Sequence, residues 1–479
     1  MSSEYKPIYV KIAKDSNSIF DYTNNYDVSS SLCMPRFDYG FQHWIHQNKN
    51  KKSVLEQFEG KKKVYHIMNE FEILVDDHDE SIYSESMKYF NFSENMDKED
   101  TRFYNIWEIL SLCELIDTKE KNFTSLCLSD TYLPIMEYRK KNATSHGKDK
   151  YTVVGNITGK NSSNIDILKT FPKTGEFDLI IMDERVKIHP ENIVEQTAQP
   201  VILKEIYNAI ALQKKGGNFV CMFYETFTIP TIKMISLLTS IYDDVAIIKP
   251  LTSRLANSEI FVVCKNFTLN DKQRDNYLSK IKNILEASES LKEKTFIVDI
   301  FTEHMPDWEF KLSLIVFNSI MSNEKIKNMD HIITYIGGSN YHGDVYRVNR
   351  NKQINATKYW NDLFLASDQI KNIQELLQNG YKYSESKIKE FSKLLINSNN
   401  MKDDKNDKKD KKDNDTKDDK NDKKDKKDKN DKNDKKDNDT KDDKKDKNDK
   451  KDNDTKDDKK DKNDKNDKKK NKKSTNKNK

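Results

Sequence analysis

Two residues that could contribute to a ligand site lie at or near the ends of apolar stretches with the character of buried strands. Asp183 ends the stretch FDLIIMD, and Met222 lies near the end of GGNFVCMF. Strands of this kind belong to parallel sheets covered by helices, in which ligands bind just beyond the carboxyl ends of the strands. Both residues are therefore expected where chemistry would take place, although the thioether of Met222 is neither an acid nor a base.

The elements that must position these residues alternate between helices and strands from residue 101 to residue 267. In order, they are RFYNIWEILSLCELI (helix), FTSLCLSD, YTVVGNIT and FDLIIMD (strands), AQPVILKEIYNAIALQKKGG (a helix closed by Gly216), NFVCMF (strand), IPTIKMISLLTSIY (helix), DVAIIKP and EIFVVCKNF (strands). This alternation predicts an α/β fold, in which right-handed βαβ units build a single parallel-dominated sheet with helices on both faces. After about residue 268 the pattern becomes mainly helical.

Three sequence blocks carry a resemblance to a known family. In chain order they are FDLIIMDERV, KKGGNFVCMFYETFT and IIKPLTSRLANSEIFVVCKNF, of which the third is the most specific. Together they resemble the FtsJ-like ribose 2′-O-methyltransferases, in particular the cap-methylating branch and its relatives in large DNA viruses. The resemblance covers about residues 101–267. It implies a Rossmann-like methyltransferase sheet whose last strand is antiparallel at or near one edge, with S-adenosylmethionine as methyl donor and RNA, including capped mRNA, as partner.

The resemblance also implies a catalytic tetrad of Lys, Asp, Lys and Glu that acts on the acceptor 2′-hydroxyl. The corresponding residues here are Asn105, Asp183, Met222 and Glu259. A ribose hydroxyl is a poor nucleophile at neutral pH, so a lysine near other charges must orient it and help to remove its proton. We expect these four residues to converge on one cleft at the carboxyl ends of the strands. Because both lysines are missing, we expect this site to be catalytically degraded.

The cofactor loop departs from the family as well. Family members leave the first strand through a Pro-Gly-Gly segment, because glycine lets the backbone approach the donor closely. In this chain Asp130, Thr131 and Tyr132 stand at the cofactor-binding positions, followed by Leu133. The side chains of Tyr132 and Leu133 would occupy the space that the methionine moiety of S-adenosylmethionine needs, so the sequence predicts impaired donor binding.

Three functions remain open at this point. The first is a methyltransferase fold that has lost catalysis and serves as a binding subunit, either for RNA or for an active partner enzyme. The second is an active mRNA cap 2′-O-methyltransferase that uses other residues, with Lys249 and Arg185 as candidates for a replacement cation. The third is an interaction protein that acts through its C-terminal tail. The residue chemistry favours the first function over the second.

Two of the candidate residues also have plain structural interpretations. Asp183 could cap the turn that follows its strand. Glu259 could form an ion pair with Arg254 in the same loop. The pair of histidines in HWIH, residues 43–46, lacks further ligands nearby, so we do not predict a metal site there.

The chain is predicted to have four parts. They are an N-terminal extension (1–100), the FtsJ-like domain (101–267), a helical C-terminal domain (268–400) and a tail (401–479). Residues 402–479 contain 34 Lys and 26 Asp, and KKDNDTKDDK occurs three times. Such a segment has no apolar surface to offset the entropy of ordering, so we expect the tail to be disordered. The rest of the chain has 50 basic and 54 acidic residues, which does not indicate a nucleic-acid binder by bulk charge.

The dispersed cysteines and the absence of long apolar runs bear on the cellular compartment. The five cysteines show no paired spacing, which indicates reduced structural thiols. No run of 18 apolar residues and no signal-peptide pattern occurs. We therefore expect an intracellular, cytoplasmic protein without a membrane partner, and the viral relatives extend this expectation to an infected host cytoplasm or a virion. Nothing in the sequence indicates the oligomeric state.

Overall fold

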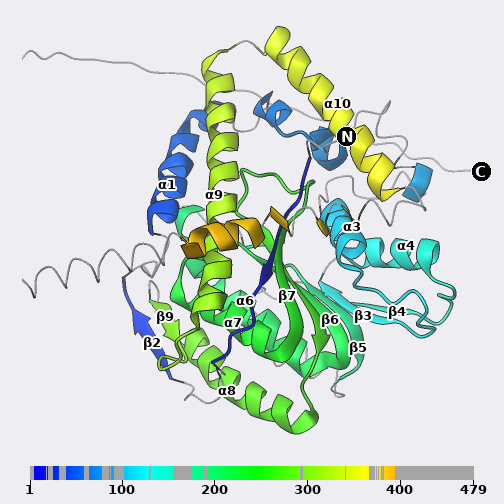
Figure 1. The fold of residues 1–479 in the computed structure, drawn as a ribbon, viewed down its shortest axis with the longest axis vertical. Helices are drawn as coiled ribbons and strands as arrows, with labels where there is room; N and C mark the ends of the chain where they lie inside the picture. The colour runs from blue at the N-terminus through cyan, green and yellow to red at the C-terminus, as the bar shows by residue number, and fades with distance from the viewer. Residues whose placement is uncertain are drawn as a thin grey trace, which may run out of the picture. The chain divides into compact units, whose positions relative to one another are not determined.

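The structure is a computed structural model, shown in Figure 1. It describes residues 5–17, 25–31, 39–58, 64–77, 102–128, 131–154, 175–186, 191–291, 295–339, 341–365 and 385–393, with residues 19, 86, 88–90, 373, 375, 377, 378, 382 and 383. These residues belong to one compact unit, Met1–Asp407. The predicted disorder of residues 401–479 and the predicted site residue Asp130 lie outside the described residues.

A seven-stranded mixed sheet forms the centre of this unit. Its strands are β1 (Ile8–Ile12), β3 (Thr124–Leu128), β4 (Lys150–Val154), β5 (Phe177–Met182), β6 (Gln213–Phe223), β7 (Tyr242–Lys249) and β8 (Ile260–Phe267). The strand order is β1-β7-β8-β6-β5-β3-β4. Strands β3, β4, β5 and β6 run parallel, and β8 is antiparallel to both β6 and β7. The single parallel-dominated sheet and the antiparallel direction of its last strand are confirmed, but β8 lies third from the β1 edge, between β6 and β7.

The edge strand β1 comes from the N-terminal extension and was not predicted as part of this sheet. It pairs antiparallel with β7, and its register aligns Val10 with Ile247. Val10 and Ile12 are buried, whereas Lys11 between them is exposed. Two buried side chains in a five-residue strand are too short a signal to identify the pairing partner from the sequence.

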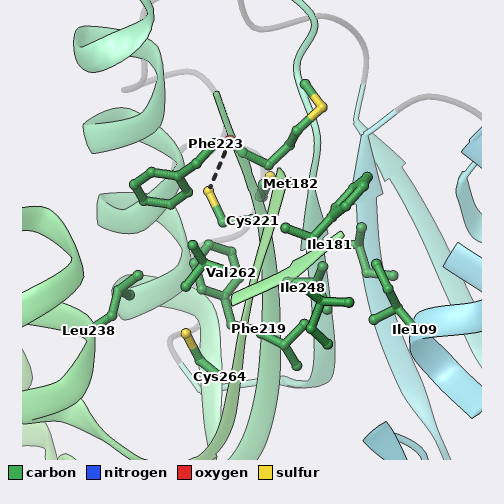
Figure 2. Close-up of a cluster of buried hydrophobic side chains, with 14 of the residues drawn as sticks. Ile109, Ile181, Met182, Phe219, Cys221, Phe223, Leu238, Ile248, Val262 and Cys264 are labelled. Atoms are coloured by element: carbon green, nitrogen blue, oxygen red, sulfur yellow. Dashed lines mark hydrogen bonds between the residues drawn. The ribbon is translucent and has the colours of Figure 1, made fainter. Parts of the chain in front are cut away.

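Helices cover both faces of the sheet. They are α3 (Arg102–Cys113), α4 (Tyr132–Asn142), α6 (Val194–Leu212), α7 (Ile229–Ile241) and α8 (Asp271–Glu289). On one face α6 packs on β5 and β6 and α7 packs on β7 and β8, while α4 packs on β3, β4 and α3. In Figure 2, Cys221 and Phe223 of β6 lie on one side of the sheet with Leu238 of α7. Ile181 of β5 lies on the other side with Ile109 of α3.

The predicted end of α6 at Gly216 is wrong. The helix ends at Leu212, and Gln213 is already extended. Gly216 has φ +81° inside β6, a left-handed conformation that glycine adopts without strain. A Cβ at Gly217 would lie 2.9 Å from the backbone oxygen of Asp178 on β5. The two glycines therefore allow the first part of β6 to pack closely beside β5, and they do not end the helix.

The segments on either side of the sheet region pack against it and against each other. After β8 and α8 the chain forms β9 (Phe296–Ile300), α9 (Trp308–Gly337) and α10 (Asp344–Phe364). Strand β9 pairs with β2 (Tyr26–Ser29), and α9 packs on β1 and on α1 (Tyr39–Asn50). The predicted helical character after residue 268 is present, with β9 as an added strand.

Short helical segments from the N-terminal extension pack against α9 and α10, the two helices at the top of Figure 1. They are the 3₁₀ helices η2 (Lys51–Phe58) and η3 (Val64–Met68), followed by the π-helix η4 (Ile73–Asp77). A further 3₁₀ turn, η6 (Glu191–Ile193), precedes α6. Within the described ranges, no helix is both long enough and apolar enough to cross a membrane.

Candidate functional site

Asp183 and Met222 lie at neighbouring positions on the carboxyl edge of the sheet. The parallel pairing of β5 with β6 aligns Met182 with Cys221, so the residues that follow them, Asp183 and Met222, lie along the same edge. Both side chains are buried, with 1% and 2% of their surface exposed. The acid and the thioether are therefore placed together, as the sequence predicts.

Glu259 joins this edge from the loop before β8. Antiparallel pairing aligns Ile260 with Phe223 at the end of β6, which places Glu259 next to that strand end. The Glu259 side chain is 19% exposed, and its Oε1 lies 3.7 Å from Nε of Arg185. The second retained carboxylate of the predicted tetrad is thus paired with a guanidinium.

The predicted ion pair between Glu259 and Arg254 is wrong. Arg254 instead donates from Nε and Nη2 to the two carboxylate oxygens of Glu72, at 3.0 and 2.5 Å. The Glu72 carboxylate also lies 2.8 Å from Nδ1 of His66. Burial alone would raise the pKa of Glu72, but the hydrogen bonds from His66 and Arg254 prevail and lower it to about 2.

Helix α3 brings Asn105 to the same region. Arg102, one turn before Asn105, has Nη1 3.8 Å from Oδ2 of Asp183. Asn105 is 2% exposed, and its Oδ1 lies 2.9 Å from the hydroxyl of Thr252. That hydroxyl is also 2.6 Å from Oε1 of Glu108. The side chain at the predicted first lysine position is therefore engaged with the loop that follows β7.

Each retained carboxylate of the site thus faces an arginine rather than a lysine. Arg102 approaches Asp183, and Arg185 approaches Glu259. A guanidinium balances the negative charge and can bind phosphate, but it keeps its proton at any physiological pH. These two arginines can hold an anion, but neither can accept a proton from a hydroxyl.

Lys249 is a buried amine that contacts the main chain at Glu259. It is 1% exposed, and its Nζ donates to the backbone oxygens of Glu259 at 2.6 Å and Asn257 at 3.2 Å. Burial lowers the pKa of Lys249 to about 8, against the opposing effect of the Glu259 charge. The geometry gives this amine a role in holding the loop, because both contacts are to main-chain oxygens.

The loop from residue 250 to residue 259 is also held by carboxylates that the sequence did not single out. Glu108 of α3 accepts hydrogen bonds from the backbone nitrogens of Leu251 and Thr252 at 2.8 and 2.9 Å. Nε1 of Trp360 on α10 donates to the same carboxylate at 3.0 Å. In the sequence, Glu108 is only an acid at the eighth position of TRFYNIWEI. Helical spacing alone does not show that this acid binds the loop.

A second buried cluster secures the end of this loop. Lys49 of α1 and Lys325 of α9 lie 2.6 and 3.3 Å from Oε1 of Glu225, which follows β6. Ser258 donates to the same oxygen at 3.1 Å and accepts from Lys325 at 2.8 Å. Burial by itself raises the pKa of Glu225, but the charges of Lys49 and Lys325 outweigh it and hold the pKa well below its usual range.

The predicted cofactor loop contains side chains where the family has glycines. Thr131 is buried with helical φ and ψ, and its hydroxyl donates to the Leu128 oxygen at 2.6 Å. Tyr132 begins α4, and Tyr132 and Leu133 pack against the hydrophobic core. No group of three His, Cys, Asp or Glu suited to a metal ion occurs among the residues that the structure describes.

Comparison with known proteins shows which family the central part of the chain resembles. Residues 136–267 match the model of the FtsJ-like methyltransferase family. This range includes Asp183, Met222 and Glu259, whereas Asn105 and Thr131 precede it.

Several curated relatives are cap methyltransferases by name. The inactive cap-specific mRNA (nucleoside-2′-O-)-methyltransferase 1B of Caenorhabditis briggsae is 25% identical over 173 residues, which are 36% of this chain and 20% of that protein. The cap-specific mRNA (nucleoside-2′-O-)-methyltransferase 1 of Dictyostelium discoideum is 40% identical over 77 residues, 16% of this chain and 10% of that protein. The human enzyme of that name is 27% identical over 146 residues, 30% of this chain and 18% of that protein. The chain thus spans about a fifth or less of the length of these relatives.

A solved ribosomal RNA methyltransferase of Plasmodium falciparum covers 36% of this chain and 99% of its own, with 17% identity and a TM-score of 0.28, a likeness too low to support an argument. The family match rests on the sequence. It ends at Phe267, the last residue of β8, and contains all three blocks that carried the resemblance. Residues 136–267 thus match the FtsJ-like methyltransferase family, and the rest of the chain lies outside that match.

Proposed function

We propose that this protein is a homologue of the cap-specific ribose 2′-O-methyltransferases that has lost methyl transfer and acts as an RNA-binding subunit. The observation that carries the proposal is the pairing of the two retained carboxylates, Asp183 and Glu259, with Arg102 and Arg185. Met222, at the predicted second lysine position, is buried and has no basic group.

The chemistry of these groups supports binding without proton removal. A 2′-hydroxyl must lose its proton as the methyl group arrives, so a base has to stand within hydrogen-bond reach. The arginines cannot act as that base, and the amine of Lys249 is turned toward two main-chain oxygens. The same arginines suit a phosphate or a ribose hydroxyl as hydrogen-bond donors.

The methyl donor is the second part of the proposal. S-adenosylmethionine supplies the methyl group in the family, and a reaction cannot proceed without it in place. Because Tyr132 and Leu133 fill the segment where the family has glycines, we propose that this chain does not bind the donor. One relative of similar sequence, in Caenorhabditis briggsae, carries the word inactive in its name, which is consistent with loss of activity within the family.

Two measurements on the full chain test the proposal. Isothermal titration with S-adenosylmethionine up to millimolar concentration should give no binding heat, with an active FtsJ-like enzyme as the positive control. Transfer of labelled methyl groups to capped and uncapped RNA oligomers should stay at background, while the same oligomers bind in a fluorescence anisotropy assay. Turnover by the unmodified chain would reject the loss of catalysis.

An active enzyme remains the second candidate, and one observation favours it. The pKa of Lys249 is lowered to about 8, so part of this amine is neutral near physiological pH. If turnover occurs, Lys249→Met should abolish it, and Lys265→Met should leave it unchanged, because the Lys265 amine donates to the backbone oxygen of Cys113.

A further inference from the structure

A chain of aromatic rings runs between the segment 58–66 and the turn from α9 to α10. The centroid distances are 4.8 Å for His66 and Tyr65, 6.0 Å for Tyr65 and Phe58, 5.9 Å for Phe58 and Tyr341, and 5.7 Å for Tyr341 and Tyr335. All of these residues lie outside the range that matches the family model. We call this set of rings, together with the ring pair His342 and Tyr346 at the start of α10, the aromatic track.

One end of the track is joined to the candidate site. Nδ1 of His66 lies 2.8 Å from Oε1 of Glu72, and Glu72 accepts two hydrogen bonds from Arg254. Arg254 belongs to the loop that carries Glu259. The first ring of the track, His66, therefore contacts the same carboxylate, Glu72, as Arg254 of the loop at the carboxyl edge of the sheet.

The other end of the track reaches the surface at the start of α10. Tyr341 and Tyr346 are partly exposed, and His342, whose ring centroid lies 6.4 Å from that of Tyr346, is exposed. Tyr335 beneath them is buried. The partial exposure of Tyr341 and Tyr346 leaves part of each side chain in contact with solvent.

Cations accompany the exposed end of the track. The Arg347 side chain is 73% exposed, and its partner Asp344, at 3.2 Å, is 92% exposed. An ion pair with that much exposure contributes little, so a phosphate can take the place of Asp344 at small cost. Lys352, on the same helix, is exposed as well.

We propose that the aromatic track binds single-stranded RNA by stacking of its bases, with Arg347 and Lys352 contacting the phosphates. Aromatic rings beside a cationic surface are the common means of holding unpaired bases, because every base offers a face for stacking. The inference rests on the proposed RNA binding and adds where the RNA lies. Exposed Val345 and Val348 on α10 would also fit a protein partner, but the cations and the link to the Arg254 loop favour RNA.

The test uses the full chain and a fluorescein-labelled, uncapped 12-nucleotide RNA in an anisotropy titration. Tyr346→Leu removes a ring at the exposed end, and Tyr346→Phe retains it as the matched control. We expect Tyr346→Leu to raise the Kd about tenfold or more, and Tyr346→Phe to change it by about twofold or less. Thermal unfolding of both variants confirms that the fold is kept.

A second pair of variants addresses the phosphate contact. Arg347→Gln should raise the Kd and reduce the dependence of binding on salt, because one phosphate contact is lost. Lys282→Gln on α8 removes another exposed cation, from a helix that packs on α6 and β9, and it should change neither quantity. An abasic oligomer of the same length should bind the unmodified chain no more tightly than RNA binds Tyr346→Leu.

The outcomes separate this inference from the proposed function. If the unmodified chain binds RNA and Tyr346→Leu binds it equally well, the track is rejected and the proposed RNA binding stands. The track is also rejected if the abasic oligomer binds as tightly as RNA, since stacking then contributes nothing. If the unmodified chain binds no RNA, both proposals fall.

Discussion

Lys325 of α9 donates a hydrogen bond of 2.8 Å to the hydroxyl of Ser258, the residue directly before Glu259. The helix lies beyond the residues that match the family model, yet it fixes the loop that carries a retained carboxylate. Lys49 of α1 reaches the same cluster through Glu225. Segments from both ends of the unit thus hold the site from outside the FtsJ-like region.

Replacing Lys325 with methionine should destabilise the protein. Lys325 and Glu225 are 3% and 5% exposed, and removal of one partner from a buried ion pair leaves charge without full compensation. We expect a loss of about 3 kcal/mol in the free energy of unfolding, measured by urea denaturation. Lys327→Met on the same helix is the control, because its side chain is 64% exposed, and it should stay within about 0.5 kcal/mol of the unmodified chain. Equal effects of the two variants would contradict the role of the cluster.

Low pH should destabilise the folded protein, because Glu72 becomes protonated. Its pKa is about 2 in the folded chain against an ordinary value of 4.5, so folding stabilises the charged form. The contribution is fully present above about pH 4.5 and is lost as the pH falls toward 2. At most it amounts to about 3 kcal/mol, since one pKa unit corresponds to about 1.4 kcal/mol.

The measurement is the free energy of unfolding between pH 2 and pH 6 for the unmodified chain and for Glu72→Gln. The variant should be less stable at pH 6 and should lose less stability on acidification. Glu286→Gln on α8, whose side chain is 59% exposed, should keep the full slope. Parallel curves for the unmodified chain and Glu72→Gln would show that Glu72 does not cause the acid sensitivity.

Restoring the two lysines should not restore methyl transfer. In Asn105→Lys with Met222→Lys, each new amine enters a position that is 2% exposed, where burial opposes its charge. Lysine at 105 also disrupts the contact with Thr252. Tyr132 and Leu133 would still occupy the donor segment, so transfer of labelled methyl groups to RNA should remain at background.

Adding Tyr132→Gly and Leu133→Gly to this variant should recover measurable binding of S-adenosylmethionine by calorimetry. It should also lower the melting temperature, because both side chains pack against the core. Met222→Leu serves as the control for repacking and should leave stability nearly unchanged. Turnover by the double lysine variant with the loop intact would show that the loop does not exclude the donor.

The N-terminal strand should be an integral part of the sheet. Ile12 is 3% exposed in β1 and aligns with Val245 of β7, so Ile12→Ala should cost about 2–5 kcal/mol of unfolding free energy. Ile8→Ala, at the partly exposed start of the same strand, should cost less. A neutral Ile12→Ala would mean that β1 contributes little to the edge of the sheet.

The local elements and the order of the central blocks could be read from the sequence. Apolar runs bounded by glycines and acids predicted the strands β5, β6 and β8, because hydrophobic periodicity and turn residues act over a few neighbouring positions. The placement of Asp183 and Met222 on one edge followed from the same pattern, since parallel strands end on one side of a sheet. The methionine at position 222, where the resemblance predicts a lysine, is evident from the sequence alone.

The tertiary structure alone decided the long-range partners. Arg254 binds Glu72, 182 positions earlier, rather than Glu259 in its own loop. The contact between Lys325 and Ser258 and the addition of β1 to β7 likewise join residues far apart in the chain. Such pairings depend on how whole elements pack, and a charged side chain carries no local mark of its partner. The sequence could therefore show that a site had changed, whereas the fold shows which groups now hold it in place.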